Sequence, residues 1–184
     1  MIRKSLQDDL RCRGVYTVRQ WTPGVVQKLL EKGVPQLEAE KIAITAGAWR
    51  GEQVIKNLIT DTGLQMIGDW AIDMESTGLT YHAIGTGSNP TSHSDAQLQA
   101  EYVRASYTSR SRAGTVTTVN AFYLGASVTI HIQELGQFGG ASASATANSG
   151  KLFSRVLYNY DNSANGFDLT FDYNITPKND PSNS

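Results

Sequence analysis

The 184-residue chain and its hydrophobic content of 40% suit one domain, with room for an appended arm. A formal net charge of −1 argues against a dedicated nucleic-acid-binding protein. A single cysteine, Cys12, excludes an intrachain disulfide and a cysteine-rich zinc site. No run approaches the roughly 20 apolar residues of a membrane helix, and charges interrupt any signal-peptide core by Asp8. We therefore expect the protein to be made and first folded in a cytosol.

Positive charge is concentrated in the first residues. Residues 1–19 hold five cationic side chains against two anionic ones, so the rest of the chain must be net acidic. The five are Arg3, Lys4, Arg11, Arg13 and Arg19. A basic segment on a mildly acidic body suits docking onto an acidic neighbour or a second copy of the chain. We assign these five residues to partner docking and predict that residues 1–51 form an arm that packs largely against other chains.

The elements expected within residues 1–51 are few. Residues 14–21 alternate like a strand, and Thr22-Pro23-Gly24 marks a turn. Residues 25–30 can return as a partner strand, whereas residues 36–44 fit either a short helix or a strand. Residues 31–51 do not have the pattern of a compact sandwich, which supports treating residues 1–51 as a separate region.

A strand over residues 52–59 is predicted to lead into a helix. Thr60 or Asp61 can cap the start of this helix. Gly63 would weaken it by roughly 1 kcal/mol relative to alanine, so packing must hold it in place. Its buried face is predicted from residues at helical spacing, namely Leu64, Ile67, Ala71 and Met74.

The strongest strand signal lies at residues 167–176, where apolar and polar residues alternate without error. A period of two indicates a strand with one buried face. Further strands are expected at residues 80–84, 102–110, 115–124, 128–134 and 151–158, with one helical turn from Ser94 or Asp95 to Leu98. Strands at such regular intervals are typical of a sandwich or barrel. The predicted fold is mainly β: an antiparallel β-sandwich over residues 52–176 with one or two short helices, preceded by the extended N-terminal arm and followed by a polar tail at residues 177–184.

Residues 161–172 come nearest to a metal site. Their oxygen-bearing side chains fall at positions one, three, five and twelve of a calcium loop, with Gly166 at position six. The second half of the loop is, however, the clearest strand of the chain, and position twelve is Asp172 rather than a longer glutamate. We therefore predict a hairpin turn at Asn165-Gly166, with no metal and no cofactor.

No catalytic residue is assigned. Ser92, His93, Ser94 and Asp95 are the residue types of a hydrolase triad, but they are consecutive in a loop. A triad needs side chains that converge from separate elements. His82 and His131 stand singly on predicted strands and are expected to face solvent or an interface. The chain is accordingly predicted not to be an enzyme.

Glu134 is a charge at the end of a strand whose inward residues are otherwise apolar. Burying an unpaired carboxylate costs several kcal/mol. We therefore predict a buried structural ion pair between Glu134 and Arg155, or otherwise Arg104. Arg104, Arg110 and Arg112 fall at even separations on one predicted strand and so should share a face. Without interleaved aromatic residues, this basic stripe suits a protein partner or intrachain pairing more than nucleic acid.

From Asn57 onward, several short motifs form a recognisable outline. They lie at residues 57–64, 84–87 with Pro90, 95–98, Glu101 with Arg104, 134–138 and 150–155. This outline resembles a domain that recurs in virion proteins of tailed bacteriophages, among them tail-fibre, baseplate and head-associated proteins. The resemblance covers about two-thirds of the chain, excludes residues 1–56 and departs at Gln137, where an apolar residue is expected. It implies a part of a virion, with no catalytic residue among its motifs.

The resulting hypothesis is a non-enzymatic structural component of a phage particle. The chain is short for a fibre shaft and lacks fibre-type repeats, which favours a capsid-decorating or cementing protein over a tail or fibre-base adaptor. A carbohydrate- or receptor-binding module is the alternative, because Trp21, Trp49 and Trp70 could stack on sugars. The expected partners are other virion proteins, of capsid or tail, and copies of the chain itself, with no nucleic acid and no membrane. The expected location is the virion, assembled in the host cytoplasm.

Overall fold

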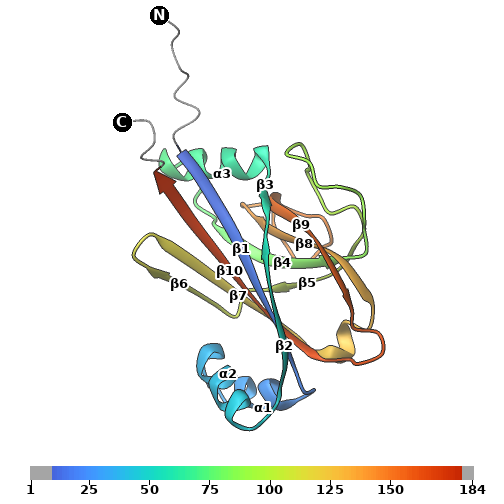
Figure 1. The fold of residues 1–184 in the computed structure, drawn as a ribbon. Helices are drawn as coiled ribbons and strands as arrows, with labels where there is room; N and C mark the ends of the chain where they lie inside the picture. Colours follow the sequence, from blue (N-terminus) through green and yellow to red (C-terminus); the bar gives the residue numbers. More distant parts are fainter. Residues whose placement is uncertain (1–9, 180–184) are drawn as a thin grey trace, which may run out of the picture.

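Two antiparallel five-stranded sheets, accompanied by three short α-helices, make up the part of the chain that the computed structural model describes, residues 10–179 (Figure 1). The mainly β, antiparallel sandwich predicted from the sequence is confirmed. Among those residues, no helix has the length and apolar character needed to cross a bilayer.

The first sheet, here called sheet 1, has the strand order β2-β1-β10-β7-β6. Its strands are β2 (Trp49–Lys56), β1 (Leu10–Trp21), β10 (Asp168–Asn179), β7 (Val116–Tyr123) and β6 (Ser109–Ala113). Strands β1 and β10 pair along their whole length, from Leu10 opposite Asn179 to Trp21 opposite Asp168. Sheet 1 therefore has strands from near both ends of the sequence at its centre.

The second sheet, sheet 2, has the order β3-β9-β8-β4-β5. Its strands are β3 (Leu58–Ile59), β9 (Lys151–Asp161), β8 (His131–Gly139), β4 (Leu79–Gly85) and β5 (Glu101–Ser106). The main core lies between the sheets and includes Tyr16, Ile84, Leu135, Phe171 and Tyr173. A smaller apolar cluster covers the other face of sheet 2, where Leu98 packs with Ala83, Phe138 and Leu152. Sheet 2 is thus covered on both faces over much of β8 and β9.

The prediction of a separate N-terminal arm over residues 1–51 is wrong for the described part of that region. Strand β1 is the second strand of sheet 1, and its Trp21 is fully buried. The Trp21 indole packs with residues of helices α1 (Val25–Glu31) and α2 (Gln36–Thr45), which lie together at one end of the sandwich (Figure 1). Burying an indole stabilises the fold by several kcal/mol, so this region belongs to the domain. Residues 1–9 lie outside the described residues.

Residues 25–30 form helix α1 rather than the expected return strand. Their apolar positions, Val25, Val26, Leu29 and Leu30, lie on one side of a helix and join the cluster around Trp21. Residues 36–44, for which helix and strand were both open, lie within α2.

Two predicted strand boundaries also need correction. The strand expected at residues 102–110 is two strands, because the chain leaves sheet 2 after β5 and enters sheet 1 as β6. The turn expected at Asn165-Gly166 does not close a hairpin, because β9 and β10 belong to different sheets. The Asn162 side chain holds this crossing by donating to the carbonyl oxygens of Val128 and Phe167 at 2.9 and 3.0 Å. The helical turn expected at residues 94–98 is irregular backbone.

Helix α3 (Asp61–Ala71) begins as predicted but is rotated relative to the predicted face. The Thr60 hydroxyl caps its start by accepting from the Gly63 N–H at 3.0 Å. Met66 is buried, whereas Leu64 is 47% exposed. Met74, predicted on the same face, is 75% exposed and lies beyond the end of the helix at Ala71. The cause of the rotation is Gly63, which is buried against β9 where a Cβ would collide with the Phe153 backbone. The helix approaches the sheet through its glycine.

Candidate functional site

Glu134 and Arg155 form the expected buried ion pair. The Arg155 Nε donates to the Glu134 carboxylate at 2.7 Å, and both side chains are almost completely buried. The pair lies on the outer face of sheet 2, however, and not between the sheets. An irregularity in the pairing of β8 between Ile132 and Glu134 changes the side-chain alternation, so that Leu135 faces the main core and Glu134 points away from it.

The Glu134 carboxylate holds the loop formed by residues 86–100. It accepts backbone N–H groups from Gly87 at 3.1 Å, Gln99 at 3.1 Å and Ala100 at 2.7 Å. A Cβ at Gly85 would lie 2.6 Å from a Glu134 carboxylate oxygen, so glycine is needed for this close approach. Three backbone donors and one guanidinium occupy the carboxylate, which explains how a charge is tolerated there.

Arg155 fastens the same loop from its other nitrogens. Its Nη1 lies 3.0 Å from the Asp95 carboxylate, and its Nη2 donates to the Asn89 carbonyl oxygen at 3.1 Å. Burial by itself would lower the pKa of Arg155, but the hydrogen bonds to Asp95 and Glu134 raise that pKa above its usual value. The guanidinium therefore stays charged and joins two strands to one loop.

Arg104, the alternative partner for Glu134, instead forms a second pair with Glu101. Its Nε and Nη2 donate to the two Glu101 carboxylate oxygens at 2.6 and 2.8 Å. Its Nη1 donates to the carbonyl oxygens of Ser144 and Ser149 at 2.9 and 3.0 Å, while the guanidinium carbon lies 4.5 Å from the centre of the Phe138 ring. This pair holds the loop of residues 140–150 as the first pair holds residues 86–100. Because Arg104 lies on β5 and Arg110 and Arg112 lie on β6, the predicted basic stripe does not exist.

These two ion pairs have no free group for proton transfer. A general acid or base must reach the proton of a bound molecule, yet Glu134 is fully buried beneath its loop. His93 contacts the Ile59 carbonyl oxygen through Nδ1, and no hydrogen bond between described residues joins it to Ser92, Ser94 or Asp95. The arrangement fixes the shape of two loops.

His82 is fully buried between the sheets, so the expectation that it faces solvent is wrong. Its Nδ1 lies 2.9 Å from the Tyr123 hydroxyl, and its ring stacks on Phe171 at 4.3 Å. Desolvation lowers the pKa of His82 to about 3, and the imidazole is therefore neutral at pH 7. His131 is exposed and contacts Asn159, as its place on an outer position allows.

Arg19, assigned from sequence to partner docking, is instead paired within the chain. Its guanidinium contacts Asp172 at 2.5 Å, Glu52 at 2.7 Å and Glu40 at 3.0 Å. Burial raises the pKa of Glu40, and the neighbouring charge of Asp172 adds to that rise. Arg13 is exposed on the outer face of sheet 1. Arg3 and Lys4, and the side chain of Arg11, lie outside the described residues.

A cavity of about 960 Å³, not predicted from the sequence, lies between α3 and the inner face of sheet 1. Ile67 and Trp70 of α3, Phe153 of β9 and Cys12 of β1 line it. The sequence feature that indicates this cavity is a pair of small residues, Cys12 and Thr117, at inward strand positions near the end of sheet 1. Larger side chains at these positions would fill the space.

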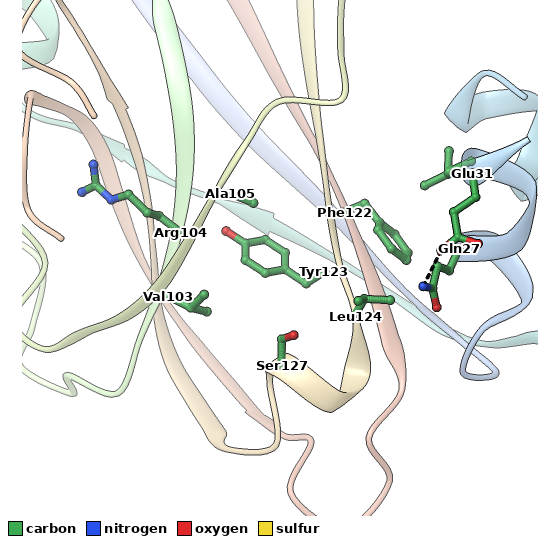
Figure 2. Close-up of a pocket in the computed structure, with 10 residues that line it drawn as sticks. Gln27, Glu31, Val103, Arg104, Ala105, Phe122, Tyr123, Leu124 and Ser127 are labelled. Atoms are coloured by element: carbon green, nitrogen blue, oxygen red, sulfur yellow. Dashed lines mark hydrogen bonds between the residues drawn. The ribbon is translucent and has the colours of Figure 1, made fainter. Parts of the chain in front are cut away.

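A second hollow, of about 550 Å³, is an open groove between α1 and the neighbouring strands. Figure 2 shows Phe122 of β7 pointing toward α1, with Gln27 and Glu31 on the facing helix. These two helical side chains hydrogen-bond to each other at 2.7 Å. The groove holds no cluster of ionisable groups, and its Arg104 is already engaged by Glu101.

Large apolar side chains are exposed where α2 leads into β2. Leu37 is 66% exposed, Ile44 is 55% exposed and Trp49 is 49% exposed. Leu37 and Ile44 are seven residues apart on α2 and therefore lie on one face of that helix. Exposed apolar groups that share a face are a mark of interaction surfaces, and tryptophan is enriched at such surfaces. The three exposed side chains Leu37, Ile44 and Trp49 are here called the α2–β2 surface.

Comparison with known proteins supplies no relative: no family model, no curated protein and no solved structure matches the chain significantly.

Proposed function

We propose that the chain is a non-enzymatic structural protein of a tailed-phage particle, with capsid decoration or cementing as its role. One observation carries the proposal. Seven of the residues on which the resemblance to phage virion domains rests also fasten the two loops, namely Gly85, Gly87, Asp95, Glu101, Arg104, Glu134 and Arg155. A set of motifs devoted to loop shape suits a protein that presents a fixed surface to other proteins.

The α2–β2 surface is the part of the chain that we assign to attachment, in place of an arm. Burying Leu37, Ile44 and Trp49 against a neighbouring virion protein would remove apolar area from water. Helix α2, which carries Leu37 and Ile44, is anchored to the sandwich through the buried Trp21. A rigid surface of this kind loses little conformational entropy when it binds.

The alternative of a sugar-binding module receives less support. Trp21 is fully buried, and its Nε1 donates to the Thr170 hydroxyl at 3.0 Å. Trp70 packs against the main core and donates to the Thr77 carbonyl oxygen at 3.2 Å. Trp49 alone of the three tryptophans is strongly exposed, so they do not form a shared stacking platform.

Quantitative mass spectrometry of purified particles of the encoding phage, split into heads and tails, tests the proposal. We expect the chain in the head fraction at a fixed ratio to the capsid protein. Its presence in the tail fraction would transfer the role to a tail or fibre-base adaptor, and its absence from washed particles would contradict the proposal.

A second experiment tests the attachment surface. Particles that lack the protein are mixed with the wild-type chain, with the double variant Leu37→Glu/Ile44→Glu, and with Lys41→Glu as a control on the same exposed helix. We expect the double variant to bind at least about tenfold more weakly, as loss of two buried apolar anchors implies, and the control to bind nearly as well as wild type. Equal binding of all three proteins would exclude the α2–β2 surface.

A further inference from the structure

We propose that the cavity between α3 and the inner face of sheet 1 binds a small amphipathic molecule that has an apolar body and one anionic group. Its volume of about 960 Å³ falls at the upper end of the range of small-molecule sites, roughly 300–1,000 Å³. The inference concerns a different surface from the α2–β2 surface and is independent of the virion role.

The walls of the cavity suit an apolar body. The rings of Trp70 and Phe153 lie nearly parallel, at an angle of 19° and with their centres 6.0 Å apart, and Ile67 and Ile175 add aliphatic surface from α3 and β10. Mostly apolar walls with a few polar groups are typical of ligand sites. An apolar occupant would remove this surface from water.

The anionic group is inferred from Arg110. This residue lies opposite Val119 in the pairing of β6 with β7, and Val119 belongs to the main core, so Arg110 also faces the inner side of sheet 1. Its Nε and Nη2 donate to the Leu79 carbonyl oxygen at 3.2 and 3.1 Å, and the Tyr107 ring lies 5.5 Å from its guanidinium carbon. These contacts hold the guanidinium at the cavity.

Arg110 has no carboxylate partner among the residues that the structure describes, and its Nη1 has no acceptor among them. Two acidic residues, Asp73 and Glu75, also line the cavity. Asp73 is exposed to solvent, whereas the Glu75 carboxylate accepts the N–H groups of Thr77 at 3.0 Å and Ala141 at 3.2 Å and lies 3.9 Å from Lys151. Arg110 is the one cationic residue among the described residues that line the cavity, and a carboxylate, sulfonate or phosphate on the ligand would complement its guanidinium.

The test uses the full chain and dodecanoate, with dodecanol as the uncharged counterpart, below the concentrations at which either aggregates. Cys12 lines the cavity and is the single cysteine of the chain, so its alkylation by iodoacetamide reports occupancy without any mutation. We expect dodecanoate to slow alkylation at least about fivefold in a saturable manner, and calorimetry to give one site per chain.

Two variants with matched controls locate the site. Thr117→Phe places a ring in the cavity and should abolish protection, whereas Thr118→Phe, on the adjacent outward position of β7, should retain it. Arg110→Met should weaken dodecanoate about tenfold, the loss expected for one charge-assisted hydrogen bond, and should change dodecanol affinity less than about twofold. Arg13→Met, on the outer face of sheet 1, should change neither.

Absence of saturable protection of Cys12 in the wild-type chain would overturn the proposal, even if Thr117→Phe failed to fold. Undiminished binding to a folded Thr117→Phe variant would overturn it as well. If Arg110→Met weakened the binding of dodecanoate and of dodecanol equally, the assignment of the anionic group would be overturned. None of these results bears on whether the chain is present in phage heads.

Discussion

Gly63 of α3 lies directly against the backbone of Phe153 in β9, where even a Cβ would collide with the carbonyl oxygen. The helix can therefore approach the sheet only through a residue without a side chain. This contact sets the rotation of α3. The side chains that the helix then packs against the main core are Met66, Ile67 and Trp70.

Gly63→Ala should destabilise the protein although alanine is the better helix former. The added methyl must push α3 away from β9, and overpacking of this kind costs roughly 1–3 kcal/mol. Gly68, on the same helix, has no atom within 4 Å of its Cβ position. Gly68→Ala should therefore raise the free energy of unfolding by up to about 1 kcal/mol. Urea denaturation of both variants measures the difference, and a gain in stability for Gly63→Ala would contradict the assigned contact.

Glu134→Ala should cost about 3–5 kcal/mol of unfolding free energy, because it leaves Arg155 buried without its partner. Hydrogen exchange of the Gly87, Gln99 and Ala100 amides should accelerate, because their acceptor is removed. Glu52→Ala removes an exposed partner of Arg19 and should cost less than about 1 kcal/mol. A loss for Glu134→Ala as small as that for Glu52→Ala would show that the buried pair does not support the fold.

The stability of the protein should depend on pH through His82. Because the pKa of His82 is lowered from 6.5 to about 3 by burial, the unfolded chain binds more protons than the folded chain between these values. The contribution of neutral His82 to the free energy of unfolding is fully present above pH 6.5. It is lost as the pH falls toward 3, by roughly 5 kcal/mol at most. The free energy of unfolding, measured by chemical denaturation at several pH values in this range, should vary less with pH for His82→Gln than for wild type. The exposed control His131→Gln should leave the slope unchanged, and equal slopes for all three proteins would refute the role of His82.

A chain that starts at Glu52 should not fold. It lacks β1, and both neighbours of β1 in sheet 1, β2 and β10, would lose a pairing partner. Far-ultraviolet circular dichroism and amide chemical-shift dispersion should report an unfolded protein. A chain that starts at Leu10 keeps every described strand and should unfold cooperatively. A folded domain from the shorter chain would restore the interpretation of residues 1–51 as an arm.

Strands with regular alternation, and charges isolated among apolar residues, could be predicted from the sequence. The alternation at residues 167–176 predicts β10, and the lone charge of Glu134 predicts its burial and its partner Arg155. The face on which this pair lies could not be predicted, because the pairing irregularity beside Glu134 depends on which strands are neighbours. The change of sheet between β5 and β6 could not be predicted for the same reason, because both strands have similar local patterns and only their neighbours differ.

Helix packing was harder to predict than strand pairing. Hydrophobic spacing predicts that Leu64 lies on the buried side of α3, but the close approach at Gly63 turns Leu64 toward solvent. The same spacing extends the helix to Met74, whereas α3 ends at Ala71. The cavity was missed because it depends on the space between elements distant in sequence, such as Cys12 and Trp70. The prediction of five docking residues rests on charge alone. Charge alone does not show that Arg19 pairs with Asp172 on the adjacent strand.

The pairing of β1 with β10 also sets the order of events during synthesis. Strand β1 leaves the ribosome well before β10, the neighbour that covers one of its edges. Until then the nascent chain carries an open strand edge and an incomplete first sheet, the kind of surface on which unwanted strand pairing begins. Closing so long a loop is also entropically costly before any contact repays it. We therefore expect the sandwich to form in a single step once β10 has left the ribosome, and chains that still lack β10 to depend on chaperones that shield extended segments.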